Sequence, residues 1–134
     1  MRVWAIAALA ATGIALAGLA IGRYSADQAS RTMSVFSEVP RYAGAIAIHK
    51  LRTDRLIEDS YVTPANVEQI VDYYDRTLRA DGWGPAAHIE RGDTATVCYR
   101  KEGYSAGVTT RSSTQSGSYR FAFGVSHMSD LCAP

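Results

Sequence analysis

The sequence predicts an α+β fold in which an N-terminal transmembrane or signal helix precedes a twisted antiparallel sheet packed by one amphipathic helix. Three observations predict this fold. A long uncharged run opens the chain, one later segment has helical periodicity, and several alternating apolar segments joined by short turns surround that segment. The length of 134 residues suits a single folded domain.

The N-terminal segment has the length and composition of a membrane span. Residues Val3 to Gly22 carry no charge, and at 1.5 Å per residue such a helix covers roughly the 30 Å of a hydrocarbon core. Trp4 lies where an interfacial aromatic residue anchors a helix. We expect residues 1–23 to be an uncleaved signal anchor in the lipid bilayer, with Val3, Trp4 and Gly22 as anchor residues.

A cleaved signal peptide is the alternative for this segment. Small residues at Ala15-Leu16-Ala17 have the spacing that a signal peptidase reads, and cleavage would make the protein secreted. The basic residues flanking the run favour a cytoplasmic C-terminus, whereas the two-residue leader is typical of export signals. Arginine far outnumbers lysine and alanine is abundant, which suggests a bacterium. We expect a single-pass protein of the cell membrane with an extracytoplasmic globular domain.

The two cysteines agree with export. Cys98 and Cys132 both follow the apolar run, and an even pair in a small exported domain is typical of a disulfide. Their bond would close a loop of 34 residues. On the chain-entropy model such a loop stabilises the fold by up to ~3.8 kcal/mol. Two free thiols in a cytoplasmic domain are the alternative.

The next segments lead into the folded domain, which we place at residues 39–134. Residues 24–38 are polar and weakly patterned, so they predict a tether, with a helix continuing from the membrane as the alternative. The domain then opens with two strand-like segments on either side of a polar turn, Ala43–Leu51 and Leu56–Val62.

The domain's helix is predicted from Pro64 to about Ala80. Its apolar residues recur at helical spacing, at Val67, Ile70, Val71, Tyr74 and Leu78. Thr63 is the expected N-cap, since proline suits the first helical position. Gly82 is expected in the left-handed conformation just after the helix, with Trp83 packing back on Leu78 as in a Schellman motif.

Four further strands are predicted after the helix, at Ala86–Glu90, Thr94–Lys101, Tyr104–Thr110 and Tyr119–His127. Their apolar residues alternate and would form one buried sheet face, on which the helix can lie. Ser112–Ser118 is rich in serine and glycine and predicts a flexible loop.

The segment from Val39 to Trp83 resembles a small extracytoplasmic domain of bacterial envelope proteins. The shared pattern is "PxYxGA … Y.T … V..V..FY...L...GW". The matching residues are Pro40, Tyr42, Gly44-Ala45, Tyr61, Thr63, Val67, Ile70-Val71, Tyr73-Tyr74, Leu78 and Gly82-Trp83. The chain departs from the pattern at Ala43, where proline is usual. The resemblance implies the fold and the location, and it implies no catalytic residues.

Several classes of function find little support in the sequence. The formal charge of +1 leaves no electrostatic footprint for nucleic acid. The three histidines and two cysteines have none of the spacings of metal sites, so we expect no metal and no cofactor. Gly103 to Gly107 matches the G-x-S-x-G motif of hydrolases around Ser105, but a strand pattern follows it, and His127 precedes Asp130.

We therefore expect a non-catalytic, membrane-tethered envelope domain that acts by binding a protein or the cell envelope, as an accessory subunit of a membrane complex. The expected partners are the bilayer and another membrane protein. Tyr42, Tyr61 and Tyr73 form the candidate binding surface, since Tyr73 lies off the apolar stripe of the helix. The alternatives are a small secreted or anchored hydrolase that uses Ser105, and a structural dimer through the GxxxG from Gly18 to Gly22.

Overall fold

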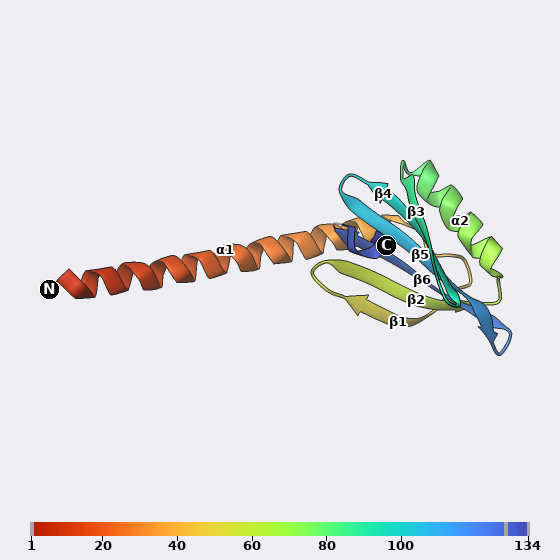
Figure 1. The fold of residues 1–134 in the computed structure, drawn as a ribbon, viewed down its shortest axis with the longest axis horizontal. Helices are drawn as coiled ribbons and strands as arrows, with labels where there is room; N and C mark the ends of the chain where they lie inside the picture. Colours follow the sequence, from red (N-terminus) through yellow and green to blue (C-terminus); the bar gives the residue numbers. More distant parts are fainter. Residues whose placement is uncertain (1, 128, 134) are drawn as a thin grey trace.

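A computed structural model describes the backbone of residues 2–127 and 129–133, and the side chains of residues 20–127 and 131–133. Within these residues the chain forms two α-helices, a six-stranded sheet and a short 3-10 helix (Figure 1). The elements in chain order are α1 (Arg2–Glu38), β1 (Ile46–Arg52), β2 (Leu56–Thr63), α2 (Val67–Ala80), β3 (Gly84–Arg91), β4 (Thr94–Lys101), β5 (Tyr104–Gln115), β6 (Ser118–His127) and η1 (Ser129–Cys132).

The sheet is antiparallel throughout and has the strand order β1-β2-β6-β5-β4-β3. The last four strands follow one another as hairpins, and β2 then pairs with β6, which adds the β1–β2 hairpin to their edge. Figure 1 shows the resulting twisted sheet with α2 lying across one face. The predicted α+β fold with an antiparallel sheet is therefore confirmed.

The core lies between the helices and one face of the sheet. The predicted apolar alternation is confirmed, because the core residues of β4, β5 and β6 point to this face: Tyr99, Ala106, Val108, Phe121, Phe123 and Val125. From α2, Ile70, Tyr74 and Leu78 pack against them. The ring of Tyr74 stacks on Phe123 with centroids 5.0 Å apart.

Helix α2 begins at Val67, and the predicted N-cap at Thr63 is wrong. Asn66 caps the helix, because its side-chain oxygen accepts a hydrogen bond from the Gln69 N–H at 2.9 Å. The Gln69 side chain accepts in turn from the Asn66 N–H at 3.0 Å. This capping box satisfies two N–H groups that Thr63 could not reach from its position three residues earlier.

The C-terminal end of α2 is a Schellman motif, as predicted. The Trp83 N–H donates to the carbonyl oxygen of Leu78 at 3.0 Å, and the Gly82 N–H donates to that of Arg79 at 3.1 Å. Gly82 has a φ of +85°, which favours glycine. Trp83 is buried in the core, so this turn also places a large apolar side chain against the sheet.

The predicted loop at Ser112–Ser118 is instead mostly strand. Strand β5 continues to Gln115 and β6 begins at Ser118, so only Ser116 and Gly117 form the turn. Both turn residues have positive φ, as a tight two-residue hairpin requires. The polar composition reflects exposure, since this end of the hairpin extends beyond the part of the sheet that the helices cover.

The segment expected as a tether is helical. Residues 24–38 belong to α1, whose last turns pack on the sheet while the rest of the helix extends away from it (Figure 1). Thr32 is fully buried, and the ring of Phe36 stacks on Phe123 with centroids 5.6 Å apart. The sheet face therefore holds two helices, where the sequence predicts one.

The predicted anchor falls largely outside the described side chains. Val3 and Trp4 are among the residues whose side chains are not described, and Gly22 has open space where a side chain would lie. Over the part of the chain with described side chains, neither helix combines the length and the apolar character that crossing a membrane requires.

Cys98 and Cys132 lie within disulfide distance, as the sequence predicts, with Cα atoms 5.8 Å apart. Cys98 is on β4 and alternates with the core residue Tyr99, so it points to the opposite side of the sheet, here called the outer face. The bond joins η1 to this outer face, where Leu131 lies near Gly107. The chain end is thereby fixed against the side of the sheet that the helices leave open.

Candidate functional site

The three tyrosines predicted as a binding surface turn out to hold the fold together. Tyr61 is buried at 4 % exposure and stacks on Phe121 with centroids 5.0 Å apart, so its expected exposure is wrong. Tyr42 and Tyr73 are half-buried and meet edge to face at 5.1 Å. The Tyr73 hydroxyl donates to the carbonyl oxygen of Pro40 at 3.2 Å, which fastens the segment after α1 to α2. A binding role for Tyr42 and Tyr73 stays a prediction.

The structure does not bring the candidate hydrolase residues together. Ser105 is 3 % exposed and is the second residue of β5, opposite Ser126 of β6. His127 is the next residue along β6 and pairs with Tyr104, so it points to the other face of the sheet. The ring of His127 packs edge to face on Tyr104 at 5.3 Å. Ser105 and His127 are thus separated by the sheet itself.

The histidines lie on three different strands. His49 is on β1, His88 on β3 and His127 on β6. His88 lies 3.5 Å from a carboxylate oxygen of Glu90. Among the described side chains, no group of three or more histidine, cysteine, aspartate or glutamate residues could hold a metal ion.

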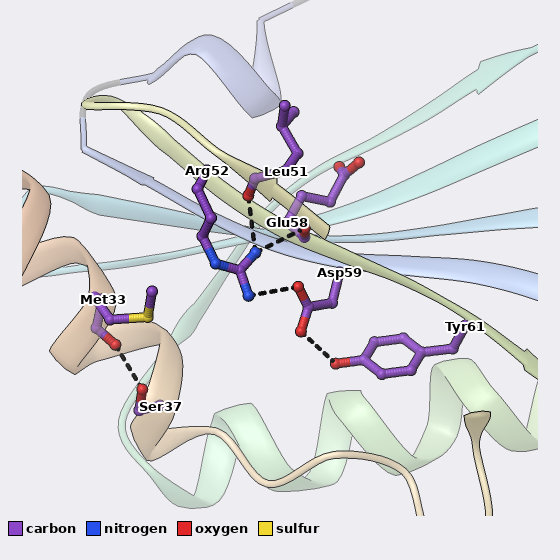
Figure 2. A network of polar contacts seen from close by, with 7 residues as sticks. All are labelled: Met33, Ser37, Leu51, Arg52, Glu58, Asp59 and Tyr61. Carbon is purple, nitrogen blue, oxygen red and sulfur yellow. Dashed lines mark hydrogen bonds and ion pairs between the residues drawn. The ribbon is translucent and has the colours of Figure 1, made fainter. Parts of the chain in front are cut away.

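A network around a buried carboxylate connects β1, β2 and the end of α1. Arg52 of β1 places a guanidinium nitrogen 2.7 Å from Asp59 Oδ1, and the Tyr61 hydroxyl donates to Asp59 Oδ2 at 3.3 Å (Figure 2). Arg52 also donates to the carbonyl oxygens of Leu51 and Glu58, at 2.8 and 3.1 Å. Its guanidinium lies 5.3 Å from the centroid of the Phe36 ring, which is a cation–π distance.

The electrostatics of this network are those of a structural ion pair. Burial, followed by the neighbouring charge of Asp59 and the hydrogen bond to it, raises the pKa of Tyr61 to about 12. The phenol therefore stays protonated at neutral pH and keeps donating to Asp59. Burial also raises the pKa of Glu58, but Glu58 alternates with Asp59 along β2 and lies on the outer face. The two carboxylates cannot act as an acid–base pair, since the sheet separates them.

The strand β1 presents an apolar edge to solvent. It is the terminal strand of the sheet, so within the described residues no strand pairs with its outer edge. Its three large apolar side chains are exposed, Ile46 at 66 %, Ile48 at 48 % and Leu51 at 37 %. In the described part of the chain, the other exposed large apolar residues all lie on α1. We call Ile46, Ile48 and Leu51 with the free backbone of β1 the β1 edge.

The opposite edge of the sheet differs in character. Strand β3 carries Pro85 beside its bulge, and its exposed residues near the other end are His88, Glu90 and Arg91. Proline and charged side chains are common means of preventing a sheet edge from pairing with another chain. The β1 edge has a bulge between Ala47 and His49 and the exposed His49 and Lys50, but it has no proline and it carries exposed large apolar side chains. The two edges therefore differ in their capacity to accept a further strand.

Sequence reasoning missed the β1 edge, although it predicted a strand there. The alternation was visible, with alanines on one face and Ile46 and Ile48 on the other. The small Ala45 and Ala47 face the core and the isoleucines face outward, which is unusual for a half-buried strand. The signal that could have identified the edge is this inverted choice of side chains together with the neighbouring His49 and Lys50.

Comparisons with known proteins add no relative. No family model matches the chain, and neither the curated proteins nor the solved structures contain a significant match.

Proposed function

We propose that this chain is a non-catalytic binding domain, tethered to a bacterial cell membrane, that holds another envelope protein along the β1 edge. The observation that carries this proposal is the exposure of Ile46, Ile48 and Leu51 on a strand whose outer backbone has no partner within the described residues. Natural sheets usually cover or charge such an edge, because it pairs readily with other chains.

A strand added to β1 would use both kinds of contact that this edge offers. Its backbone would hydrogen-bond to the free N–H and C=O groups of β1, which supplies affinity. Its apolar side chains would cover Ile46 and Leu51, which alternation places on the outer face. The exposed His49 and Lys50 favour a partner segment in which acidic residues accompany the apolar ones.

The proposed membrane tether and the proposed location outside the cytoplasm are supported by further observations. The uncharged run from Val3 to Gly22 has the length of a membrane span, and α1 connects it without a break to the sheet. Cys98 and Cys132 lie within disulfide distance, which favours an oxidising compartment outside the cytoplasm. The resemblance of Val39–Trp83 to an extracytoplasmic envelope domain supports the same location.

The test is to purify the full chain in mild detergent from the membranes of the cells that produce it. The proposal expects a stoichiometric membrane partner, and it expects Ile48→Asp to lose that partner. Ala86→Asp is the matched control, because Ala86 is the exposed bulge residue of the opposite edge strand, as Ile48 is of β1. Absence of any partner, or equal recovery with both variants, would contradict the proposal.

A further inference from the structure

The outer face of the sheet contains a hollow of about 340 Å³ that spans β1, β2, β6 and β5. The residues that matter for its chemistry are His49, Ser60, Thr109, Arg111, Arg120 and Ala122. It lies on the side of the sheet away from α1 and α2, and it is separate from the Arg52–Asp59 network, while Phe121 of its lining also belongs to the core.

Strand register builds the floor of the hollow from one row of residues. His49 is opposite Ser60, Ser60 is opposite Ala122, and Ala122 is opposite Thr109. Residues directly opposite one another in an antiparallel sheet share a face, so these four side chains lie side by side. Ala122 ends at its Cβ atom and leaves space in the row, while the other three supply an imidazole and two hydroxyl groups.

Two arginines flank this row on the same face. Arg111 is two residues beyond Thr109 on β5, and Arg120 is two residues before Ala122 on β6. Like charges on neighbouring strands repel one another when nothing neutralises them. Arg111 lies 4.0 Å from an Asp93 carboxylate oxygen, the longest ion pair of the described side chains. Arg120 has no ion pair with any described side chain.

Besides Asp93, which lies near Arg111, a second acidic group lies to one side of the hollow. Glu58 is on the outer face of β2, two residues before Ser60 and opposite Gly124, and it interacts electrostatically with His49. It does not line the hollow. The hollow is therefore lined by two arginines and by no carboxylate, which favours an anion between Arg111 and Arg120.

We propose that this hollow binds a phosphate group, either free phosphate or the headgroup of a phospholipid. Arg111 and Arg120 provide the charge and the planar donor pairs that suit phosphate oxygens. The Ser60 hydroxyl donates from the floor and His49 donates from the β1 side. The Thr109 hydroxyl shares a 2.8 Å hydrogen bond with Thr96, and it donates to the phosphate when Thr96 is the donor of that bond. The hollow shares Ile48 and His49 with the region of the β1 edge, but its positive charge comes from Arg111 and Arg120, which lie on β5 and β6, so the two proposals can be tested with different variants.

The test is an NMR titration of inorganic phosphate into the isotope-labelled full chain in neutral detergent. The reference is a titration with sodium chloride at equal ionic strength. Saturable amide shifts are expected at residues 49, 60, 109–111 and 120–122. Arg120→Gln is expected to weaken binding roughly tenfold, as the loss of one charge-assisted contact implies. Arg100→Gln is the matched control, since Arg100 is an exposed arginine of the outer face beyond the hollow, and it should change affinity by less than about twofold.

A second arm separates the two sources of phosphate. The full chain is placed in bilayer discs of phosphatidylcholine alone or with added phosphatidic acid. A headgroup site shows the same shifts in the acidic discs without added phosphate, and Arg120→Gln removes them. A free-phosphate site shows them only when phosphate is added.

Two results would overturn the proposal. One is that neither probe gives saturable shifts while the spectrum shows a folded chain. The other is that Arg100→Gln and Arg120→Gln weaken binding equally, which would mean diffuse surface attraction. Arg120→Lys, which keeps the charge, should retain part of the affinity and guards against a folding defect. Recovery of a protein partner at the β1 edge should be unchanged in Arg120→Gln, so the two proposals can fail separately.

Discussion

Replacing Asp59 with asparagine tests how strongly the ion pair with Arg52 holds the end of α1 against the sheet. The change keeps the shape of the side chain and one oxygen that can accept from Tyr61, and it removes the negative charge and the oxygen that faces Arg52. The Asp59 side chain is 10 % exposed and that of Arg52 is 34 % exposed, so the pair is shielded but not fully buried. A charge-assisted hydrogen bond contributes roughly 1.5–3 kcal/mol.

We therefore expect Asp59→Asn to lower the free energy of unfolding by about 2 kcal/mol, toward the low end because Arg52 retains two backbone carbonyl partners. For a folded part of this size, the melting temperature should fall by roughly 8 °C. Urea denaturation of the full chain in mild detergent, followed by the fluorescence of the buried Trp83, measures the change. Asp72→Asn is the control, because it breaks the exposed pair with Arg76 and should cost less than about 0.5 kcal/mol.

The reasoning fails if Asp59→Asn and Asp72→Asn destabilise the chain equally. A double-mutant cycle sharpens the result. Arg52→Met alone leaves the Asp59 carboxylate without its partner, whereas Arg52→Met with Asp59→Leu leaves no unpaired charge. The double variant should be more stable than Arg52→Met alone, and an additive loss would mean that the two side chains do not interact.

Three further predictions concern the disulfide, the helix end and the acid range. Replacing both Cys98 and Cys132 by serine should lower the free energy of unfolding by up to ~3.8 kcal/mol. Thiol labelling of the unreduced native chain should find neither sulfur free, and labelling of both would contradict the bond. Gly82→Ala should cost about 1 kcal/mol because φ is positive there, whereas Gly84→Ala, with space for a Cβ and no positive φ, should be nearly neutral in the same melting assay. The hydrogen bond from Arg79, and next that from Tyr99, lowers the pKa of Asp75, so the folded state binds this proton less readily than the unfolded state. The contribution of Asp75 to the free energy of unfolding is present above the unfolded carboxyl pKa of about 3.9 and is lost as the pH falls through the lower folded pKa. Asp75→Asn should therefore flatten the acid side of the plot of stability against pH. An unchanged slope there would refute this.

Features with local causes could be predicted from the sequence. The ends of β4 follow from two short turns, and the end of α2 follows from Gly82 and Trp83, because a Schellman motif needs only residues adjacent in the chain. The start of α2 was also readable, since Asn66 and Gln69 have the spacing of a capping box. The predicted start at Pro64 lies three residues before the observed start at Val67, because proline is common at the first position of a helix.

Features that depend on strand order could not be predicted in this way. Tyr61 is buried because β2 lies second in the sheet beside β6. It shares its face of β2 with Asp59 and Thr63, and that this face is the buried one is known only once the strand order is known. Residues 24–38 look like a tether because their few apolar side chains are sparse, yet Phe36 meets Phe123, which is 87 residues later in the chain. The hollow on the outer face likewise forms only when four strands align.

The most direct test of the proposed function is site-specific photo-cross-linking in intact cells. A benzophenone side chain placed at Ile48 should give one discrete adduct of higher mass, because the β1 edge lies against the partner. The same group placed at Ala86, on the opposite edge, should give none. Equal adducts at both positions, or no adduct at Ile48, would contradict the claim that this edge binds another protein.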